Sequence, residues 1–433
     1  MHAGDGPQSR RTPLAWAGGL TALLFAGAAW PVAPLRDAAT GAAADAHLRL
    51  SPAFLALAPL NNTLDALSLL SVREHAVVWY VLGAVYIAWR VRRRLTRQVS
   101  PRGWMREFRV LGIALACLIA VYATGALVSR PMAALALPTR DSDLVTIDFH
   151  SHTNASHDGR TWFTPARNRE WHAAAGFDAA YISDHFTFAG AEIGTRANPA
   201  RSGAGTVLFS AIECLEGGEH VNVLGVTAAD YVLFNGRYIA PAAVDAAISA
   251  GRPRPVIVQT IPGALTRLPR LGMPGVVPVA AIELSDAAPR GLSDSDRDRT
   301  RILALADSLG LAVVAGSDNH GWGRTAAAWS VMLVPGWRAL TPDTLERRVE
   351  DGIRIGGRHA VQVIERTRPV WSIRTTAQGP AGWVSNAAGA PGFFGRFVWQ
   401  LTATRSWAER ASWLAWIWLV ALFVAWRART KPA

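Results

Sequence analysis

Four long runs of uncharged, mostly apolar residues interrupt this chain of 433 residues. Such runs predict membrane-spanning helices, because a helix needs about 20 apolar residues to cross the hydrocarbon core of a bilayer. The second and fourth runs are short, with 14 and 16 uncharged residues, but flanking arginines can lengthen a span by snorkelling. A buried core helix is the alternative interpretation of these two. We expect a membrane region over residues 1–140 and transmembrane helices over about residues 12–35, 72–90, 110–129 and 411–426.

Positive charge is concentrated beside these apolar runs. Of the formal net charge of +12, Arg90–Arg109 carries +7, the tail 427–433 carries +3 and the N-terminus carries +1. Because arginine is enriched on the cytoplasmic side of membrane proteins, we expect a multi-pass protein of the inner (cytoplasmic) membrane with its large domain in the periplasm. Little charge remains for a nucleic-acid-binding face, so no nucleic-acid partner is expected. Cleavage of residues 1–30 as an export signal is an alternative that leaves the domain outside.

Between the third and fourth runs, short strand-like segments alternate with helical patterns. Residues 141–380 predict one α/β domain, followed by a linker over 381–410 and a basic tail over 427–433. This alternation indicates a parallel sheet, and polar residues at the ends of many strands favour a barrel. Gly- and Pro-rich segments at 251–278 and 377–396 predict loops. The expected strands are Leu144–Phe149, Ala179–Ile182, Val207–Ile212, Val221–Gly225, Pro255–Gln259, Ala280–Leu284 and Ala312–Gly316.

Histidine and carboxylate residues stand at the ends of several of these strands. His150 and His152 end the first strand two residues apart, so both side chains lie on one face, and Asp318 and His320 end the last with the same spacing. Neutral imidazole together with carboxylate suits Zn, Mn or Fe rather than Ca. Coincidence is a weak explanation for several such groups in one domain. Further candidate ligands are His157, Asp158, His185, Glu213 and His220. Two histidines stand alone and are interpreted as ordinary helix or surface residues, His172 and His359.

Taken together, these groups resemble the four motifs of the polymerase and histidinol phosphatase (PHP) family of metal-dependent phosphoesterases. Asp148–Gly159, DFHSHTNASHDG, resembles the family's D-L-H-x-H-T-x-x-S-D-G, and Ile182–His185 resembles its T-D-H motif. Glu213 with His220 resembles the third motif, and Gly316–His320, GSDNH, resembles G-S-D-x-H. The resemblance covers under half of the chain and leaves the apolar runs outside.

The resemblance implies a distorted (β/α)7 TIM-like barrel of PHP type that holds two or three divalent metal ions at the carboxyl ends of its strands. About four transmembrane helices would flank this α/β barrel. Asp148 would support the site by orienting a ligand imidazole. The implied ligands are His150, His152, Glu213 and Asp318 for one ion, Glu213 and His220 for a second, and His185, His320 and Asp158 or His157 for a third.

Two departures from the family pattern affect this assignment. His157 is inserted before Asp158, which leaves open which of the two binds metal. Asp158 is favoured because Gly159 follows it, as in the family. In a mid-domain strand where the family often has a histidine before a proline, this chain has Ile261, so the second ion would be weakly held or completed by water.

The implied activity is hydrolysis of a phosphoester by a metal-activated water, with Asp158 and His185 among the catalytic groups. Arg160 and Arg324 are candidates to clamp a substrate phosphate, although a lone loop arginine is more often solvated. The expected substrate is a small phosphorylated compound, such as a nucleotide, a sugar phosphate or a lipid headgroup, and the expected surroundings are a lipid bilayer. Alternatives are a nuclease or phosphodiesterase, and a non-catalytic membrane sensor with a degenerate metal site. The oligomeric state stays open.

Overall fold

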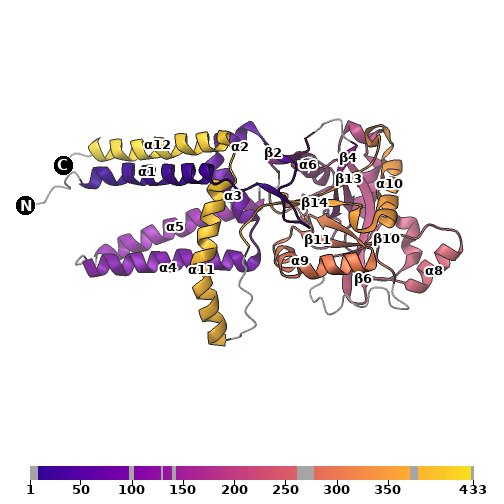
Figure 1. Ribbon diagram of the computed structural model, residues 1–433. Helices are drawn as coiled ribbons and strands as arrows, with labels where there is room; N and C mark the ends of the chain where they lie inside the picture. Colours follow the sequence, from indigo (N-terminus) through magenta and orange to yellow (C-terminus); the bar gives the residue numbers. More distant parts are fainter. Residues whose placement is uncertain are drawn as a thin grey trace, which may run out of the picture.

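The computed structural model describes residues 8–96, 102–127, 130–138, 143–260, 277–370 and 379–430. Figure 1 shows two regions, an α/β domain and a bundle of long helices that projects from one side of it.

A curled mixed sheet forms the centre of the α/β domain, and its strands follow the order β1-β14-β13-β4-β5-β6-β7-β10-β11-β12. A short strand pair, β8 and β9, joins the sheet at β6, and a separate two-stranded sheet pairs β2 with β3. The strands are β1 (Leu35–Asp37), β2 (His47–Leu50), β3 (Ala133–Ala136), β4 (Leu144–Ser151), β5 (Ala179–Ile182), β6 (Val207–Glu216), β7 (Glu219–Leu224), β8 (Phe234–Asn235), β9 (Tyr238–Ile239), β10 (Val256–Gln259), β11 (Ala281–Asp286), β12 (Ala312–Gly316), β13 (Ala328–Leu333) and β14 (Gln362–Arg366).

The sheet contains two parallel runs, β4-β5-β6 and β10-β11-β12, joined through antiparallel β7. The prediction of a parallel sheet is therefore correct only in part. Two residues, Gly217 and Gly218, separate β6 from β7, and both have positive φ. A two-residue turn of this kind folds a strand back on its neighbour, so β6 and β7 must be antiparallel.

Curling of the sheet brings its two parallel runs together. Just beyond β12, the Asp318 N–H donates to the His150 carbonyl at 2.9 Å, and Asn319 bridges to Ser151. The carboxyl ends of β4, β5, β6 and β12 therefore meet at one rim, as they do in a TIM-like barrel. This curled half-barrel fits the predicted fold class, although the mixed strand directions depart from an ideal (β/α) barrel.

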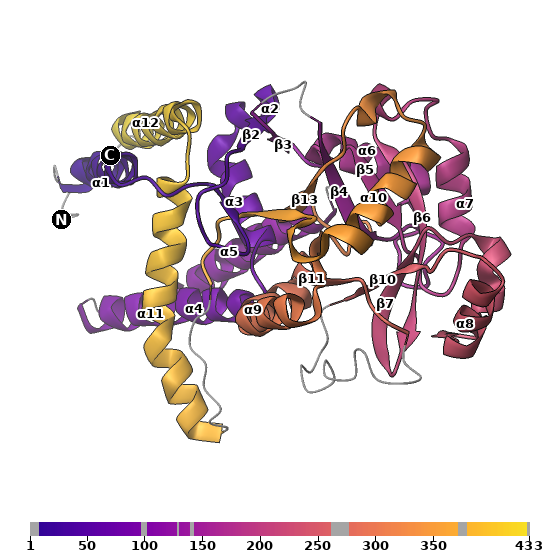
Figure 2. The ribbon, with the colours of Figure 1, turned by 45° about the vertical axis from the view of Figure 1, so that its right-hand side comes forward.

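Successive side chains of β4 point alternately to the two faces of the sheet, so apolar residues face the core and polar residues face the opposite side. Val145, Ile147 and Phe149 point into a buried apolar cluster that also contains Leu345 and Val349 of α10. The intervening polar side chains of β4 consequently point to the opposite face of the sheet. The helices of the domain are α6 (Pro165–Ala175), α7 (Ala189–Arg196), α8 (Pro241–Ser249), α9 (Pro289–Leu309) and α10 (Pro342–Gly356), with short 3-10 turns at Ser202–Ala204, Ala228–Leu233, Trp337–Ala339 and Gly357–His359. Figure 2 shows α7 and α8 at the end of the domain farthest from the helical bundle, and α9 beside the bundle.

Long helices make up the second region. Helices α1 and α12 lie side by side, α4 and α5 project in the same direction, and α11 crosses them (Figure 1). The helix α1 approaches α11 so closely at Gly27 that a Cβ there would stand 2.8 Å from backbone of Thr402. The helices are α1 (Gln8–Ala29), α2 (Pro52–Ala56), α3 (Ala58–Ser68), α4 (Val72–Thr96), α5 (Arg102–Leu127), α11 (Gly379–Ala403) and α12 (Trp407–Thr430).

Within the described residues, two helices are long and apolar enough to cross a membrane by length and composition, rather than the four predicted. They are Phe108–Gly125 in α5 and Trp407–Arg427 in α12. In α1 the apolar segment Pro13–Ala29 is shorter. In α4 the charges of Arg73 and Glu74 at one end and the arginines from Arg90 onward at the other leave too short an apolar stretch.

Two further segments differ from their predictions. The Gly- and Pro-rich region predicted as loop and linker forms helix α11, in which Phe393 is fully buried against Leu70 and Val77. Tertiary burial of this apolar face overrides the low helix propensity of glycine and proline. In addition, β1 pairs with β14, so part of the predicted membrane region 1–140 belongs to the main sheet.

Candidate metal centre

Two histidines at the end of β4 face each other across a common space. His150 Nε2 lies 3.0 Å from His152 Nε2, and both side chains are buried. The pairing register of β4 with β5 shifts between Asp148 and Ser151, which marks a bulge at His150. Bulges of this kind re-aim side chains beside active sites.

Glu213 from β6 and Asp318 from the turn after β12 complete this group. Glu213 Oε2 lies 3.0 Å from His150 Nε2 and 3.2 Å from His152 Nε2, and Asp318 Oδ1 lies 3.2 Å from His152 Nε2 and 3.5 Å from His150 Nε2. Donor atoms around one tetrahedral ion are expected about 3.4 Å apart, because metal bonds to imidazole and carboxylate are about 2.0–2.2 Å long. The four atoms are therefore spaced as the ligands of one ion.

Backbone strain accompanies this arrangement. Asp318 has a φ of +45°, in the left-handed region that non-glycine residues rarely adopt. The structure holds it there by the hydrogen bond of its N–H to the His150 carbonyl. Strained backbone of this kind clusters at functional sites, where the surrounding structure fixes it.

Glu213 also faces a second pair of histidines. Its Oε2 lies 3.5 Å from His185 Nδ1, and its Oε1 contacts His220 Nδ1. His220 comes from the neighbouring strand β7, which the hairpin places beside β6, and its side chain is about half exposed. Glu213 can thus bridge two ions, one with each of its oxygens.

The third group gathers around Asp158. Its Oδ2 lies 3.1 Å from His320 Nε2 and 3.3 Å from His185 Nε2. Burial opposes ionisation of this carboxyl, but the Ser156 hydroxyl and His320 lower the pKa of Asp158 to about 2. His157 lies farther away, with its Nδ1 4.0 Å from Asp158 Oδ1 and its side chain 68% exposed.

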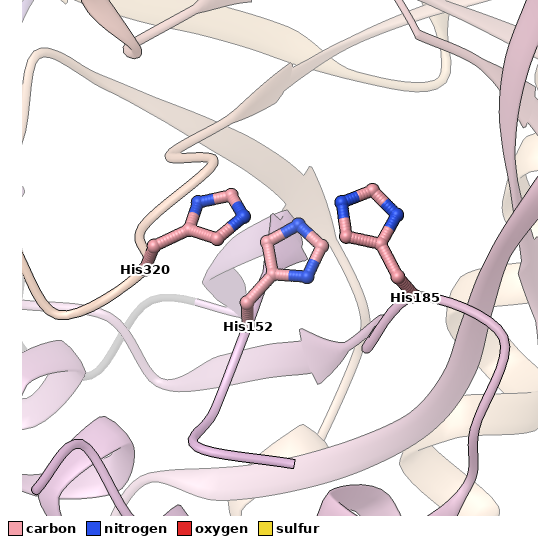
Figure 3. Close-up of side chains that lie close together, drawn as sticks. All are labelled: His152, His185 and His320. Atoms are coloured by element: carbon pink, nitrogen blue, oxygen red, sulfur yellow. The ribbon is translucent and has the colours of Figure 1, made fainter. Parts of the chain in front are cut away.

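Figure 3 shows that His152, His185 and His320 lie close together although they come from three separate parts of the chain. The rings of His152 and His320 stack with centroids 4.0 Å apart, and those of His152 and His185 stack at 4.8 Å. One donor atom from each of the three lies within 4.8 Å of the others. The structure thus brings all eight predicted ligands into one cluster.

Glu283 of β11 is a functional residue that the motif pattern did not reveal. It is fully buried, and its Oε1 lies 2.8 Å from His150 Nδ1. Its strand pairs with β12 through a register shift between Glu283 and Ser285, so a second bulge lies opposite the first. The only sequence signal was a carboxylate inside the otherwise apolar predicted strand Ala280–Leu284.

Asp148 supports the site differently from the prediction. Its Oδ1 accepts the backbone N–H groups of His150 at 3.1 Å and Ser317 at 2.9 Å, whereas the prediction had it orient a ligand imidazole. Its Oδ2 lies 2.7 Å from Nε2 of His172, which is fully buried rather than an ordinary surface residue. Asp148 therefore ties the two ligand-bearing loops together through their backbones.

Neighbouring charged groups shift the pKa values of the residues in the cluster. Burial alone would lower the pKa of His150, but Glu283, Glu213 and Asp318 raise it well above its usual value. Burial would likewise raise the pKa of Glu213, yet contact with His150 holds it well below. Burial lowers the pKa of His185 to about 4, so this ring is neutral near pH 7. Because imidazole binds metal in its neutral form, an ion bound at His150 would displace the proton that these carboxylates favour, whereas His185 is already neutral.

Unpartnered ring nitrogens show that the residues fit a metal ion. Among the described residues, His185 Nδ1, 3.5 Å from Glu213 Oε2, and His320 Nε2, 3.1 Å from Asp158 Oδ2, are buried without a hydrogen bond of good geometry. Buried polar atoms normally have such partners, so nitrogens left without them beside carboxylates fit ligands of divalent ions.

The two candidate arginines have different positions. Arg160 lies beside the cluster, where its N–H donates to the His320 carbonyl at 3.0 Å and its guanidinium contacts Trp162 and Trp322. Arg324 is buried and points away from the site to α3, where its Nη2 donates to Asn61 Oδ1 at 2.9 Å. The helical bundle supplies the partners of Arg324, and this position argues against its predicted role as a phosphate clamp.

Strand β10 and the residue after it support the backbone of His220, a candidate ligand of the second ion. Gln259 Nε2 and Thr260 Oγ1 donate to the His220 carbonyl at 3.0 and 2.9 Å, so these side chains hold the backbone of a candidate ligand. Ile261, where the family pattern places a histidine, lies outside the described residues.

No family model matches the chain, and no curated protein matches it. Among solved structures, the chain is similar to PsfC from Pseudomonas syringae, with 18% identity, a TM-score of 0.35, and coverage of 57% of this chain and 98% of that one. It is also similar to a two-domain protein from Bacteroides vulgatus containing a predicted PHP-like metal-dependent phosphoesterase, with 16% identity, a TM-score of 0.33, and coverage of 52% and 65%. The lesion-specific endonuclease PfuEndoQ from Pyrococcus furiosus matches with 15% identity, a TM-score of 0.34, and coverage of 51% and 57%.

Proposed function

We propose that this chain is a metal-dependent phosphoesterase of PHP type, which hydrolyses a phosphoester at the histidine and carboxylate cluster. The observation that carries the proposal is the convergence of His150, His152, Glu213 and Asp318. The ring nitrogens of His150 and His152 lie 3.0 Å apart and 3.0–3.5 Å from carboxylate oxygens of Glu213 and Asp318, although the four residues come from three distant parts of the chain.

Two or three divalent ions, of Zn, Mn or Fe, fit the donors present. Such ions supply Lewis acidity, which makes water a nucleophile at neutral pH and neutralises charge on phosphoryl oxygens. The proposed ligand sets are His150, His152, Glu213 and Asp318; Glu213 and His220; and Asp158, His185 and His320.

Arg160 is the proposed phosphate-binding residue. Among the described residues, its Nε and Nη2 have no hydrogen-bond partner, while Trp162 and Trp322 hold the guanidinium beside the cluster. A guanidinium in this position can donate two hydrogen bonds to phosphoryl oxygens and so orient the substrate toward the cluster.

The direct test is metal analysis of the full chain in detergent, followed by hydrolysis of a panel of phosphoesters with and without chelator. We expect bound divalent metal and chelator-sensitive phosphate release. His150→Ala and Asp318→Ala should each remove both, whereas His359→Ala, on a surface turn, should remove neither. Hydrolysis that survives chelation and both ligand variants would overturn the proposal.

We also propose that the helical bundle spans the inner membrane with the α/β domain on the periplasmic side. None of the span Phe108–Gly125 is buried, and apolar side chains such as Ile113, 64% exposed, would be unfavourable in water. The start of α1, the end of α12, the end of α4 and the start of α5 lie at the far end of the bundle from the α/β domain (Figure 1). Arg90 and Arg427 are therefore on the side where positive charge is retained. Nucleic acid is not a proposed substrate, because these arginines are remote from the cluster.

Reporter fusions test this topology. A reporter fused after Pro138 should be exported, and one fused after Gln98 should stay in the cytoplasm. The placement is wrong if the Pro138 fusion is cytoplasmic.

A further inference from the structure

The metal cluster opens into a cavity between the α/β domain and the helical bundle. The cavity has a volume of about 450 Å3, which suits a small ligand or part of a larger one. Asp158, Asp318 and His320 line it on the side of the domain, and residues of α3, α4 and α5 line it on the side of the bundle. A substrate bound at the cluster would therefore face the bundle.

Two helices give the far end of the cavity an apolar wall. Leu64 and Leu67 of α3 and Val121 and Gly125 of α5 line it. The spacing of three or four residues places each pair on one face of its helix. Gly125 has no side chain, and a Cβ there would lie 3.5 Å from Leu64. A larger side chain at this position would project into the space between the helices.

Several polar groups on the bundle side of the cavity are already bonded to other protein groups. His75 Nδ1 lies 3.1 Å from the Tyr122 hydroxyl, and the Tyr122 ring stacks on Trp79 at 5.2 Å. The Ser68 hydroxyl donates to the Leu64 carbonyl at 2.8 Å, as expected for serine inside a helix. Thr325, which completes the polar part of the wall, donates to Asp65 at 3.0 Å. A sugar or a nucleobase would lose hydration at this wall and gain few hydrogen bonds in return.

Helix α5 continues from the cavity as an apolar surface. Phe108–Gly125 is 18 residues long, and none of its residues is fully buried, although Val121, Tyr122 and Gly125 are partly covered where they line the cavity. Val110, three turns from the cavity-lining Val121 and on the same face of α5, is 51% exposed. The apolar end of the cavity thus adjoins the surface proposed to face lipid, so a hydrocarbon chain could lie in both without meeting water.

From this juxtaposition of metal cluster, apolar wall and lipid-facing helix, we infer that the substrate is a lipid phosphoester. Its phosphate binds at the cluster beside Arg160, and its hydrocarbon chain lies between α3 and α5. The inference rests on the proposed phosphoesterase function and adds the class of substrate. In the reaction, the oxygen of water bonds to phosphorus, the bond between phosphorus and the lipid oxygen breaks, and one proton of the water passes to the departing lipid alcohol.

The test compares two phosphomonoesters with the full chain in nanodiscs, a long-chain diacylglycerol phosphate and water-soluble glycerol phosphate. We expect kcat/KM to be at least tenfold higher for the long-chain compound. Gly125→Phe, which fills the space beside Leu64, should reduce the ratio of the two kcat/KM values at least tenfold. Gly112→Phe is the matched control, because it changes the same residue type on the same helix where nothing lies within 4 Å. It should leave the ratio unchanged.

A binding measurement gives a readout that does not depend on turnover. Native mass spectrometry should show retention of a long-chain alkylphosphonate, but not of methylphosphonate, by the metal-loaded chain and by Gly112→Phe. Gly125→Phe should retain less of the long-chain compound, and its metal content would show that the variant is folded.

Failure of the inference and failure of the proposed function give different results. Equal kcat/KM for the two esters with bound metal, or an unchanged ratio in Gly125→Phe, would overturn the lipid substrate and leave the phosphoesterase intact. Absence of both metal and hydrolysis with either ester would overturn the phosphoesterase and the inference with it.

Discussion

Glu283 Oε1 lies 2.8 Å from Nδ1 of His150, on the opposite edge of the ring from the Nε2 that faces His152 and Glu213. Both residues sit at register shifts of their strands. A carboxylate at Nδ1 holds the proton on that nitrogen and leaves Nε2 free to bind a metal ion. The register shifts of β4 and β11 therefore place Glu283 where it can orient the His150 ring for metal binding.

Replacing Glu283 should weaken metal binding without removing a ligand. We expect Glu283→Ala to lower metal affinity about 10–100-fold, the usual effect of losing a residue that orients a ligand. Glu283→Gln, which can still accept the Nδ1–H, should have a smaller effect. Competition with a chelator measures the affinities, and Glu346→Gln on remote α10 serves as a control. Unchanged affinity in Glu283→Ala would show that His150 needs no such support.

Because His157 is inserted before Asp158, either residue could be the metal ligand of this loop. Asp158 lies within 3.1–3.3 Å of His320 and His185, whereas His157 is mostly exposed. Asp158→Ala should therefore lower metal affinity at least ~10-fold, and His157→Ala should leave metal content intact. Metal stoichiometry of the two variants decides between them, and loss of metal only in His157→Ala would reverse the assignment.

Arg324 should matter for stability rather than for the substrate. It is buried between the α/β domain and α3, and its Nε lies 3.4 Å from Asp65 Oδ1. Breaking a buried ion pair costs about 3–5 kcal/mol, but Arg366 still pairs with Asp65 at 3.1 Å, so we expect Arg324→Leu to cost about 3 kcal/mol or less. Thermal unfolding measures the loss, and metal content should not change.

Arg160→Leu provides the contrasting variant. It should raise KM for a phosphoester while leaving the unfolding temperature nearly unchanged, because the Arg160 guanidinium packs on Trp162 and Trp322 and its Nε and Nη2 make no hydrogen bond within the described residues. The opposite pattern, with KM raised only in Arg324→Leu, would restore Arg324 as the phosphate-binding residue.

Glu346 on α10 should make stability depend on pH. Burial and the neighbouring Glu350 raise its pKa from 4.5 to about 8. The folded protein therefore binds more protons than the unfolded chain between these values, so this contribution to stability is complete below about pH 4.5 and is lost as pH rises through about 8. Glu346→Gln keeps an acceptor for the Ser210 N–H, now at 3.0 Å, and should remove the loss.

Unfolding measurements at pH 5, 7 and 9 test this expectation. The difference in stability between wild type and Glu346→Gln should grow in favour of the variant as pH rises. Glu170→Gln on exposed α6 is the control for a general charge effect, and a pH dependence shared by all three proteins would contradict the role of Glu346.

Local spacing allowed the sequence alone to identify the candidate ligands. His150 and His152, or Asp318 and His320, stand two residues apart at the end of a short apolar run, and strand geometry puts such pairs on one face. Where the sheet curls, the carboxyl ends of its strands lie close together, and the histidine and carboxylate residues there become neighbours. The bridging position of Glu213 followed from the family resemblance and agrees with its contacts to His150 and His220.

Only the tertiary structure decided the roles of residues whose partners are distant in the chain. Arg324 and Arg160 look alike in sequence. Arg324, however, contacts Asn61 and Asp65, more than 250 residues away, and therefore points away from the site. Glu283 looked like an interruption of an apolar strand until its position opposite His150 was known.

Helix α11 also could not be predicted from the sequence. Its glycine and proline residues predict a loop, but burial of Phe393 against Leu70 stabilises a helix. The cavity that joins the cluster to α3 and α5 also has no sequence signature. Hydrophobic periodicity and motif spacing report contacts between near neighbours in the chain, whereas burial, ion pairing and cavity shape depend on which distant segments the fold brings together.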